Sequence, residues 1–196
     1  MKELTLTDEQ KAILATDTDI AVNAVAGSGK TSTMIEYAAS RPPGSRILYL
    51  AFNKSVKMEA ARKFTERGLN NVRVETAHSL AYRYIMRDSK YSLSSQGYKT
   101  HQIAEILSLS GDGARHSEFI LANHISKFIT YFCNSDKAKV QDLNYLDTVK
   151  EANAKKFVHA FYRVIEEGTR HFLAKMDKAE IEITHDFYLK KFQLSS

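Results

Sequence analysis

Residues 23–32, which read Asn-Ala-Val-Ala-Gly-Ser-Gly-Lys-Thr-Ser, constrain the fold of this chain more than any other stretch. A short apolar run at 19–22 precedes them, and a segment with helical spacing follows at 33–39. Glycines let successive backbone N–H groups turn toward one point, and a helix that begins there adds the positive end of its dipole. The order of strand, glycine-rich turn, Lys-Thr pair and helix predicts a loop that binds phosphate groups.

The side chains of this loop have expected roles in binding a nucleoside triphosphate. Lys30 would reach the β- and γ-phosphates, and the Thr31 hydroxyl would hold Mg²⁺. The residues expected to surround the nucleotide are Ala26, Gly27, Ser28, Gly29, Lys30, Thr31 and Ser32. Ala24 stands where the usual pattern begins with glycine, and alanine is small enough to leave the geometry possible. The alternative is an ordinary Gly-Ser turn, but the flanking strand and helix favour the phosphate loop.

Composition limits the class of protein and its surroundings. A chain of 196 residues with 43% hydrophobic and 26% charged residues suits one large or two small globular domains. Cys133 is the only cysteine, which excludes a disulfide framework and a cysteine-based zinc site. No apolar run is long enough to cross a bilayer, and the N-terminus lacks a secretory signal, so we expect an intracellular protein. The net charge of +5 is compatible with a polyanionic partner without establishing one.

The first half of the chain alternates between strand-like and helix-like segments. The predicted strands are 19–22, 46–52 and 72–76, and the predicted helices are 7–14, 33–39, 55–67 and 77–86. Thr7 and Gln10 form a capping-box pattern, Asn53 is a predicted N-cap, and Gly68 closes the helix that follows Asn53. The alternation predicts a parallel sheet with helices on its faces, and the almost unbroken apolar run at 46–52 predicts a strand covered on both sides.

Beyond residue 88 the pattern becomes helical. A polar, turn-rich stretch at 89–97 is a candidate boundary, and turns are expected at 111–113 and 134–136. One predicted apolar stripe consists of Leu121, Ile125, Phe128 and Phe132, and a second of Phe157, Phe161, Val164 and Ile165, running toward Phe172. These aromatic residues could be read as stacking platforms for bases, but helical spacing favours core packing.

Three segments beyond the loop carry a family resemblance. They are residues 6–14, 47–55 and 74–81, which stand in this order around the loop. In this order they resemble the N-terminal part of superfamily 1 DNA helicases of the UvrD/Rep type, and most closely the F-box DNA helicase branch. The resemblance covers residues 4–81 and returns at 183–190, which is similar to the helix before the family's magnesium-binding strand.

The resemblance implies a fold and a domain organisation. The expected fold is α/β, with an incomplete P-loop NTPase (RecA-like) parallel sheet and an inserted all-helical subdomain. The expected ATP-binding motor subdomain is 1–86, the helical insertion is 87–182, and 183–196 returns to the motor subdomain, ending before the magnesium-binding strand.

The resemblance also implies contacts to nucleotide and DNA. Gln10 would hydrogen-bond the adenine of ATP, although the capping box explains this residue without a ligand. Asn53, Lys54, Thr76 and His78 would grip single-stranded DNA at the carboxyl edge of the sheet. Three of these four have a plainer alternative: a helix cap for Asn53, a solvated face for Lys54 (shared with Lys57), and a buried histidine for His78. Their order and spacing favour the family roles.

One residue departs from the family pattern. Many relatives carry an aromatic residue two places before the Asn-Lys pair, whereas Ala51 stands there and Phe52 directly precedes Asn53. This shift makes base stacking by Phe52 doubtful and leaves a place in the core as the alternative.

An ATPase of this class also needs an acidic pair at the end of an apolar strand, for Mg²⁺ and for activating water. The only Asp-Glu pair is Asp8-Glu9, at a predicted helix start, and Asp186 lies in a helical segment. The arginines supplied by a second motor domain are missing as well. We therefore expect an N-terminal helicase portion that binds ATP without hydrolysing it, with a sheet edge left unpaired where the next strand belongs.

The expected parent activity is ATP-driven movement on single-stranded DNA, with ATP and Mg²⁺ as cofactors. The expected partners are single-stranded DNA or duplex junctions, and the second motor domain in cis. A membrane is not an expected partner. The compartment would be the cytoplasm in a bacterium and the nucleus in a eukaryote. A small P-loop nucleotide kinase and a truncated, non-enzymatic regulator that binds DNA or a protein remain as alternatives. Gln10 and the segments at 53–54 and 76–78 would be unexplained in a kinase.

Overall fold

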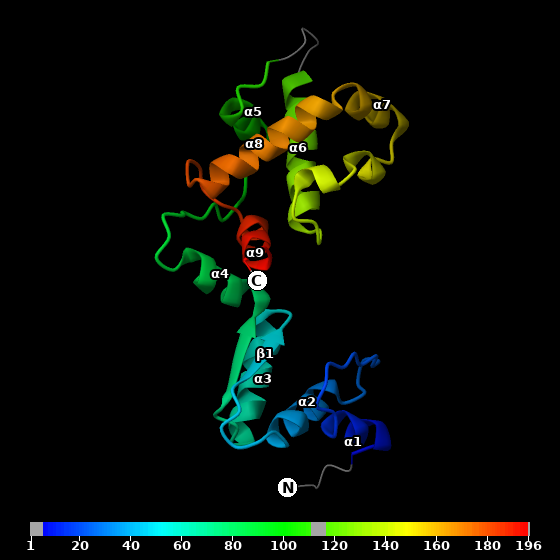
Figure 1. The fold of residues 1–196 in the computed structure, drawn as a ribbon, viewed down its shortest axis with the longest axis vertical. Helices are drawn as coiled ribbons and strands as arrows, with labels where there is room; N and C mark the ends of the chain where they lie inside the picture. The colour runs from blue at the N-terminus through cyan, green and yellow to red at the C-terminus, as the bar shows by residue number, and fades with distance from the viewer. Residues whose placement is uncertain (1–5, 111–116, 196) are drawn as a thin grey trace. The chain divides into compact units, whose positions relative to one another are not determined.

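The computed structural model describes residues 6–110 and 117–195, and these form two compact units that divide between Leu80 and Ala81. The elements in chain order, shown in Figure 1, are α1 (Asp8–Leu14), α2 (Lys30–Ala39), β1 (Ile47–Ala51), α3 (Lys54–Glu66), β2 (Val72–Thr76), α4 (Ala77–Met86), α5 (Thr100–Ile106), α6 (Ser117–Cys133), α7 (Ala152–Ala160), α8 (Tyr162–Asp177) and α9 (His185–Gln193), with 3-10 turns at Val140–Asp142 and Tyr145–Thr148. The turn predicted at 111–113 lies outside the described residues.

The first unit is built on a two-stranded parallel sheet. Strands β1 and β2 pair in register from Ile47↔Val72 to Ala51↔Thr76, and α3 makes the crossover that a parallel pair requires. One face of the sheet packs on α2 and α3, and Tyr49 of β1 meets Phe64 of α3 edge-on with ring centroids 5.3 Å apart. The predicted strands at 46–52 and 72–76 are thus confirmed.

Local capping determines where two helices of this unit begin. The capping box at α1 is complete, because the Gln10 N–H donates to Thr7 Oγ1 (3.3 Å) and the Thr7 N–H donates to Gln10 Oε1 (3.0 Å). At α3, Asn53 Oδ1 accepts the N–H of Val56 (2.9 Å). Both predicted caps are confirmed, as is the predicted helix at 77–86.

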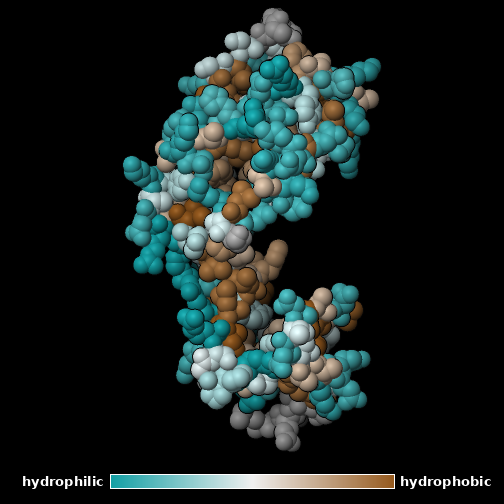
Figure 2. Space-filling model, viewed as in Figure 1, coloured by the Kyte–Doolittle hydropathy of each residue, from teal (hydrophilic) through white to brown (hydrophobic). Residues whose placement is uncertain are grey.

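Two sequence predictions for the sheet are wrong. Residues 19–22 form no strand, and Ile20 and Val22 are exposed, because a strand needs a neighbour for its backbone groups and none of the described residues supplies one. The second face of β1 is not covered either: Leu48 is 46% exposed and Leu50 is 53% exposed. Figure 2 shows apolar surface over the strands of this unit.

The second unit is helical, with α6 packed against α5 and α8 (Figure 1). The apolar stripe predicted for α6 is confirmed, since Leu121, Ile125, Phe128 and Phe132 are all buried in one core. The second predicted stripe is partly wrong. A break at Phe161 separates α7 from α8, which rotates the faces of the two helices, so that Val164 is exposed.

The last described segment belongs to the core of the helical unit. Ile183 is fully buried and forms an isolated parallel bridge with Leu93, and Phe187 and Tyr188 of α9 are buried in the same core. The sequence placed this segment with the motor subdomain, whereas the structure groups it with residues 81–182. The functional division at 86 and 182 stays a prediction.

A buried histidine makes the stability of the helical unit depend on pH. The Nδ1 atom of His124 lies 2.9 Å from the Tyr145 hydroxyl, and its ring stacks on Phe157. Burial, with the nearby Lys127 charge, holds the pKa of His124 below its ordinary value of 6.5. Burial also raises the pKa of Tyr145 to about 12, so this hydroxyl stays protonated at neutral pH.

We expect the free energy of unfolding to be highest above pH 6.5 and to fall as the pH drops through 6.5 toward the lowered pKa of His124. In this range of pH, His124 takes up a proton in the unfolded chain but stays neutral in the folded chain, so protonation favours unfolding. Urea unfolding at a series of pH values, followed by circular dichroism, measures the effect. His124→Gln should flatten the dependence around pH 6. An unchanged profile in this variant would show that another group is responsible.

Candidate functional site

The loop at 25–30 has the backbone geometry of an anion cradle. Gly27 and Gly29 have φ angles of 80° and 82°, in the left-handed region that side chains disfavour. Helix α2 begins directly after Gly29, and no side chain in the described part of the chain caps its first N–H groups. These free donors and the positive end of the helix dipole therefore lie at an exposed loop, as anion binding requires.

Lys30 is folded back over this loop. Its Nζ donates to the carbonyl oxygens of Val25 (2.7 Å) and Ala24 (3.2 Å), and the residue is exposed. Carbonyl oxygens are weak partners for an ammonium group compared with phosphate, so this contact leaves Lys30 available to an anionic ligand. Thr31 and Ser32 are half-buried in the first turn of α2, and Ala26 and Ser28 are exposed. The nucleotide roles of these residues stay predictions.

Gln10 lies against the end of the loop. Its Nε2 donates to Thr33 Oγ1 of α2 (2.9 Å), and a Cβ atom added at Gly29 would lie 3.3 Å from the same nitrogen. The side-chain amide thus serves the capping box and also ties α1 to α2. The adenine role of Gln10 stays a prediction. To bind adenine, the side-chain amide would have to give up one of these hydrogen bonds and form one to the base instead.

The residues predicted to contact DNA gather at one edge of the sheet. Asn53 and Lys54 follow the end of β1, Thr76 ends β2, and the pairing of Ala51 with Thr76 brings the two strand ends together. Thr76 is held in place because its N–H and hydroxyl both bond Ser79 Oγ at 3.0 Å. The structure therefore assembles this group, while its contacts to DNA stay a prediction.

His78 lies in the first turn of α4 and is exposed. The alternative of a buried histidine is thus wrong. Exposure at this edge is what a side chain needs in order to meet a ligand.

A buried carboxylate beneath this edge was missed by the sequence analysis. Glu75 is only 7% exposed, and its oxygens meet Lys57 Nζ (2.9 Å), Arg73 Nε (3.3 Å) and Ser79 Oγ (2.7 Å). The solvated-face alternative for Lys57 is therefore wrong. This network ties α3 and the start of α4 to β2 and so positions both predicted DNA segments. The available signal was a charged residue at the penultimate position of the predicted strand 72–76.

Phe52 lies in solvent. It is 94% exposed between the end of β1 and the Asn53 cap, so the alternative of a place in the core is wrong. A large aromatic ring left in solvent beside Lys54 is unusual for packing and typical of a binding surface.

Comparison with known proteins gives the family. Residues 6–190 match the model of the UvrD/REP helicase N-terminal domain. The chain belongs to the UvrD/Rep helicase family. It is 33% identical over 145 residues to F-box DNA helicase protein 1 of Schizosaccharomyces pombe, covering 66% of this chain and 16% of that protein. It is 27% identical over 209 residues to F-box DNA helicase 1 of Gallus gallus, covering 100% of this chain and 20% of that protein. No solved structure matches it significantly.

In this UvrD/Rep family chain, the acidic residues considered for the metal-binding pair lie outside the phosphate loop and the helix that follows it. Asp8 and Glu9 form the first turn of α1, and Asp186 lies in the first turn of α9, within the helical unit. Within residues 6–110 and 117–195, no cluster of three His, Cys, Asp or Glu side chains could hold a metal ion. The Mg²⁺ role of Thr31 stays a prediction. None of the helices in the described part is long and apolar enough to span a membrane.

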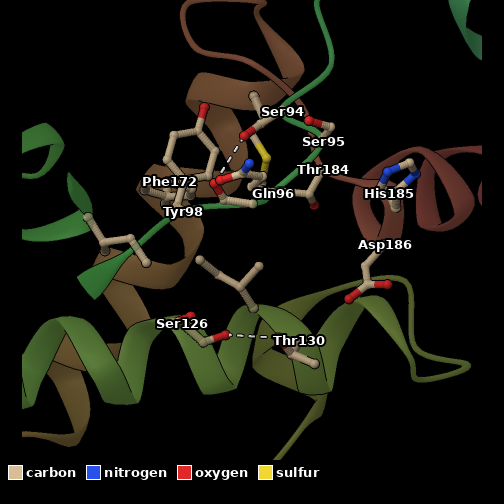
Figure 3. Close-up of a pocket in the computed structure, with 14 residues that line it drawn as sticks. Ser94, Ser95, Gln96, Tyr98, Ser126, Thr130, Phe172, Thr184, His185 and Asp186 are labelled. Atoms are coloured by element: carbon tan, nitrogen blue, oxygen red, sulfur yellow. Dashed lines mark hydrogen bonds between the residues drawn. The ribbon is translucent and has the colours of Figure 1, made fainter. Parts of the chain in front are cut away.

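The helical unit of this UvrD/Rep chain contains a separate pocket of about 380 Å³, shown in Figure 3. Its lining includes Ser94, Tyr98 and Phe172 on one side and Ser126 and Thr130 of α6 on the opposite side. Among the described residues that line it there is no lysine or arginine. This lining does not suit a triphosphate, so the candidate nucleotide site remains the loop at 25–30.

Proposed function

We propose that this chain is the N-terminal ATP- and DNA-binding part of an ATP-dependent DNA helicase. The observation that carries the proposal is the placement of two features in one unit: a loop with two left-handed glycines that opens onto α2, and a sheet edge where Asn53, Lys54 and Thr76 meet. In parallel α/β sheets, ligands bind outside the carboxyl ends of the strands. The fold proposed is accordingly that of a P-loop, RecA-like motor subdomain.

The donor set of the loop fits a nucleoside triphosphate. Backbone N–H groups at the start of α2 and the Lys30 ammonium would hold the phosphates, and Thr31 would hold Mg²⁺. The bound metal ion would neutralise phosphate charge. Gln10, next to Gly29, would select the adenine. All these groups are supplied by α1, α2 and the loop between them.

The sheet edge fits a single strand of DNA held without sequence preference. Lys54 would contact a backbone phosphate, and the exposed ring of Phe52 would stack on a base. Asn53 is engaged as the cap of α3, which fixes the loop that presents both neighbours. Stacking tolerates any base, which suits a protein that moves along DNA.

The activity proposed for the whole protein is ATP-driven translocation on single-stranded DNA and separation of duplexes. The chain spans no more than about a fifth of the length of the curated relatives it matches. Hydrolysis needs carboxylates that bind the metal and orient water, together with charge-stabilising groups from a second motor domain. We therefore propose that these 196 residues alone bind ATP and do not turn it over.

Anisotropy of a fluorescein-labelled oligothymidine tests the DNA-binding edge. Phe52→Ala should weaken binding by about 5- to 150-fold, the equivalent of about 1–3 kcal/mol for one stacked base. Lys54→Ala should weaken it as well and should reduce the slope of log affinity against log salt by about 0.7, the contribution of one phosphate on a single strand.

Met58→Ala and Lys11→Ala are the matched controls, since Met58 is an exposed apolar residue of α3 and Lys11 is an exposed cation of α1. Neither should change the affinity. If all four variants bind oligothymidine like the parent chain, the edge is not a DNA site and the proposed function fails.

A further inference from the structure

A groove of about 490 Å³ lies in the helical unit between α8, α9 and the segment 138–141. Its walls are mainly apolar side chains, contributed by Ile85, Phe132, Val140, Leu173, Phe187 and Leu194. It shares no residue with the phosphate loop or the sheet edge. The proposed function therefore leaves this surface unexplained.

The two helices present matching stripes to the groove. The lining residues of α8 are Arg170, Leu173, Ala174 and Asp177, and those of α9 and its C-cap are Phe187, Lys190, Lys191 and Leu194. Both sets follow the spacing i, i+3, i+4, i+7, which is the face that a helix turns toward a packing neighbour. Figure 1 shows α9 next to the C-terminal half of α8. Two helical stripes on the walls of an open groove fit a third helix.

The groove also carries an excess of positive charge. Lys139 and Arg170 line it and are exposed. Arg170 pairs with Glu166, one turn earlier on α8 (3.8 Å), and Lys191 pairs across the groove with Asp177. Lys190 contributes a further cation that is only 2% exposed, with Nζ bonded to neutral oxygens of Ser135 (2.8 Å) and Gln193 (3.0 Å). Four cations thus face one carboxylate among the described lining residues, so the rim favours an anionic partner.

We propose that this groove binds an acidic amphipathic helix of a protein partner, with its apolar side chains between α8 and α9 and its carboxylates against Lys139, Arg170 and Lys191. Each stripe spans eight residues, about 10 Å along a helix axis, so about two turns of the partner would be engaged. A nucleic-acid strand fits less well, because the walls are apolar and phosphates would be desolvated against them.

The probe for the test is a fluorescein-labelled 15-residue peptide of about four helical turns, with leucines at i, i+3, i+4 and i+7 and glutamates at the flanking positions. A second peptide has lysines in place of the glutamates. Anisotropy titrations with the full 196-residue chain should show about tenfold or greater preference for the acidic peptide. This preference should shrink as salt is added.

Two variants address the groove. Lys139→Glu with Arg170→Glu reverses the rim charge, and Ala174→Phe fills the groove without changing charge; Ala174 is exposed, so the fold should tolerate the change. Each should weaken the acidic peptide by about tenfold or more. The matched control is Lys155→Glu with Lys156→Glu on α7, which makes the same charge change at exposed positions outside the groove and should leave the affinity unchanged.

The proposal would be overturned if the two peptides bound equally well or if the acidic peptide did not bind. It would also be overturned if the groove variants and the control variant weakened binding of the acidic peptide equally. Binding of decanoate without binding of the peptide would also overturn it, by assigning the groove to a small amphiphile. Retained binding of oligothymidine by the groove variants would show that the two sites are independent.

Discussion

Lys30→Ala is expected to weaken ATP binding by about 10- to 100-fold while leaving the fold intact. The ammonium is exposed and donates to the carbonyl oxygens of Ala24 and Val25, which are exposed residues, so its removal leaves neither acceptor buried and unpaired. A charge-assisted hydrogen bond to phosphate contributes about 1.5–3 kcal/mol, which corresponds to this loss of affinity. Titration with a fluorescent N-methylanthraniloyl derivative of ATP measures the change directly.

Lys11→Ala provides the control for general electrostatic effects. Lys11 is an exposed cation of α1 that pairs with Asp8 at 3.0 Å, and its loss should leave nucleotide affinity unchanged. Urea unfolding of both variants should match that of the parent chain. Undiminished ATP binding by the Lys30 variant would mean that the loop at 25–30 is not the nucleotide site.

Phe128→Ala is expected to lower the free energy of unfolding of the helical unit by about 3–5 kcal/mol. Phe128 has no exposed surface, and its ring stacks on Tyr145 with centroids 4.8 Å apart. Alanine would leave a cavity at the centre of the core, between α6 and the segment that carries Tyr145. Urea denaturation followed by circular dichroism should show an earlier transition.

Phe119→Ala is the matched comparison, because it removes the same side chain from the same helix at a position that is 38% exposed. Its effect should be much smaller, since little apolar area returns to water. Similar losses in both variants would show that Phe128 does not anchor the core. The assignment of the α6 stripe to packing would then fail.

Features that depend on near neighbours in the chain were predictable. The capping box of Thr7 and Gln10 and the Asn53 cap each involve residues three positions apart, so local chemistry alone selects them. The α6 stripe was predictable for the same reason, because helical periodicity places Ile125 and Phe128 on one face.

Features that depend on distant partners were not predictable in this way. Glu75 is buried because Lys57, 18 positions earlier, reaches it from α3, and no periodicity encodes that pairing. Phe52 has an apolar side chain, and only the geometry of the turn after β1 leaves it in solvent. The run at 19–22 has the composition of a strand but, among the described residues, no partner to pair with.

The amino-acid order by itself determined the glycine turn before Lys30, the helix starts and the apolar face of α6, because these follow from backbone sterics and from spacing along one element. Only the tertiary structure decided which faces are covered. It left Leu48, Leu50 and Phe52 in solvent and opened a basic, apolar groove between α8 and α9. Burial is a property of what packs against a residue, and that depends on elements far away in the chain.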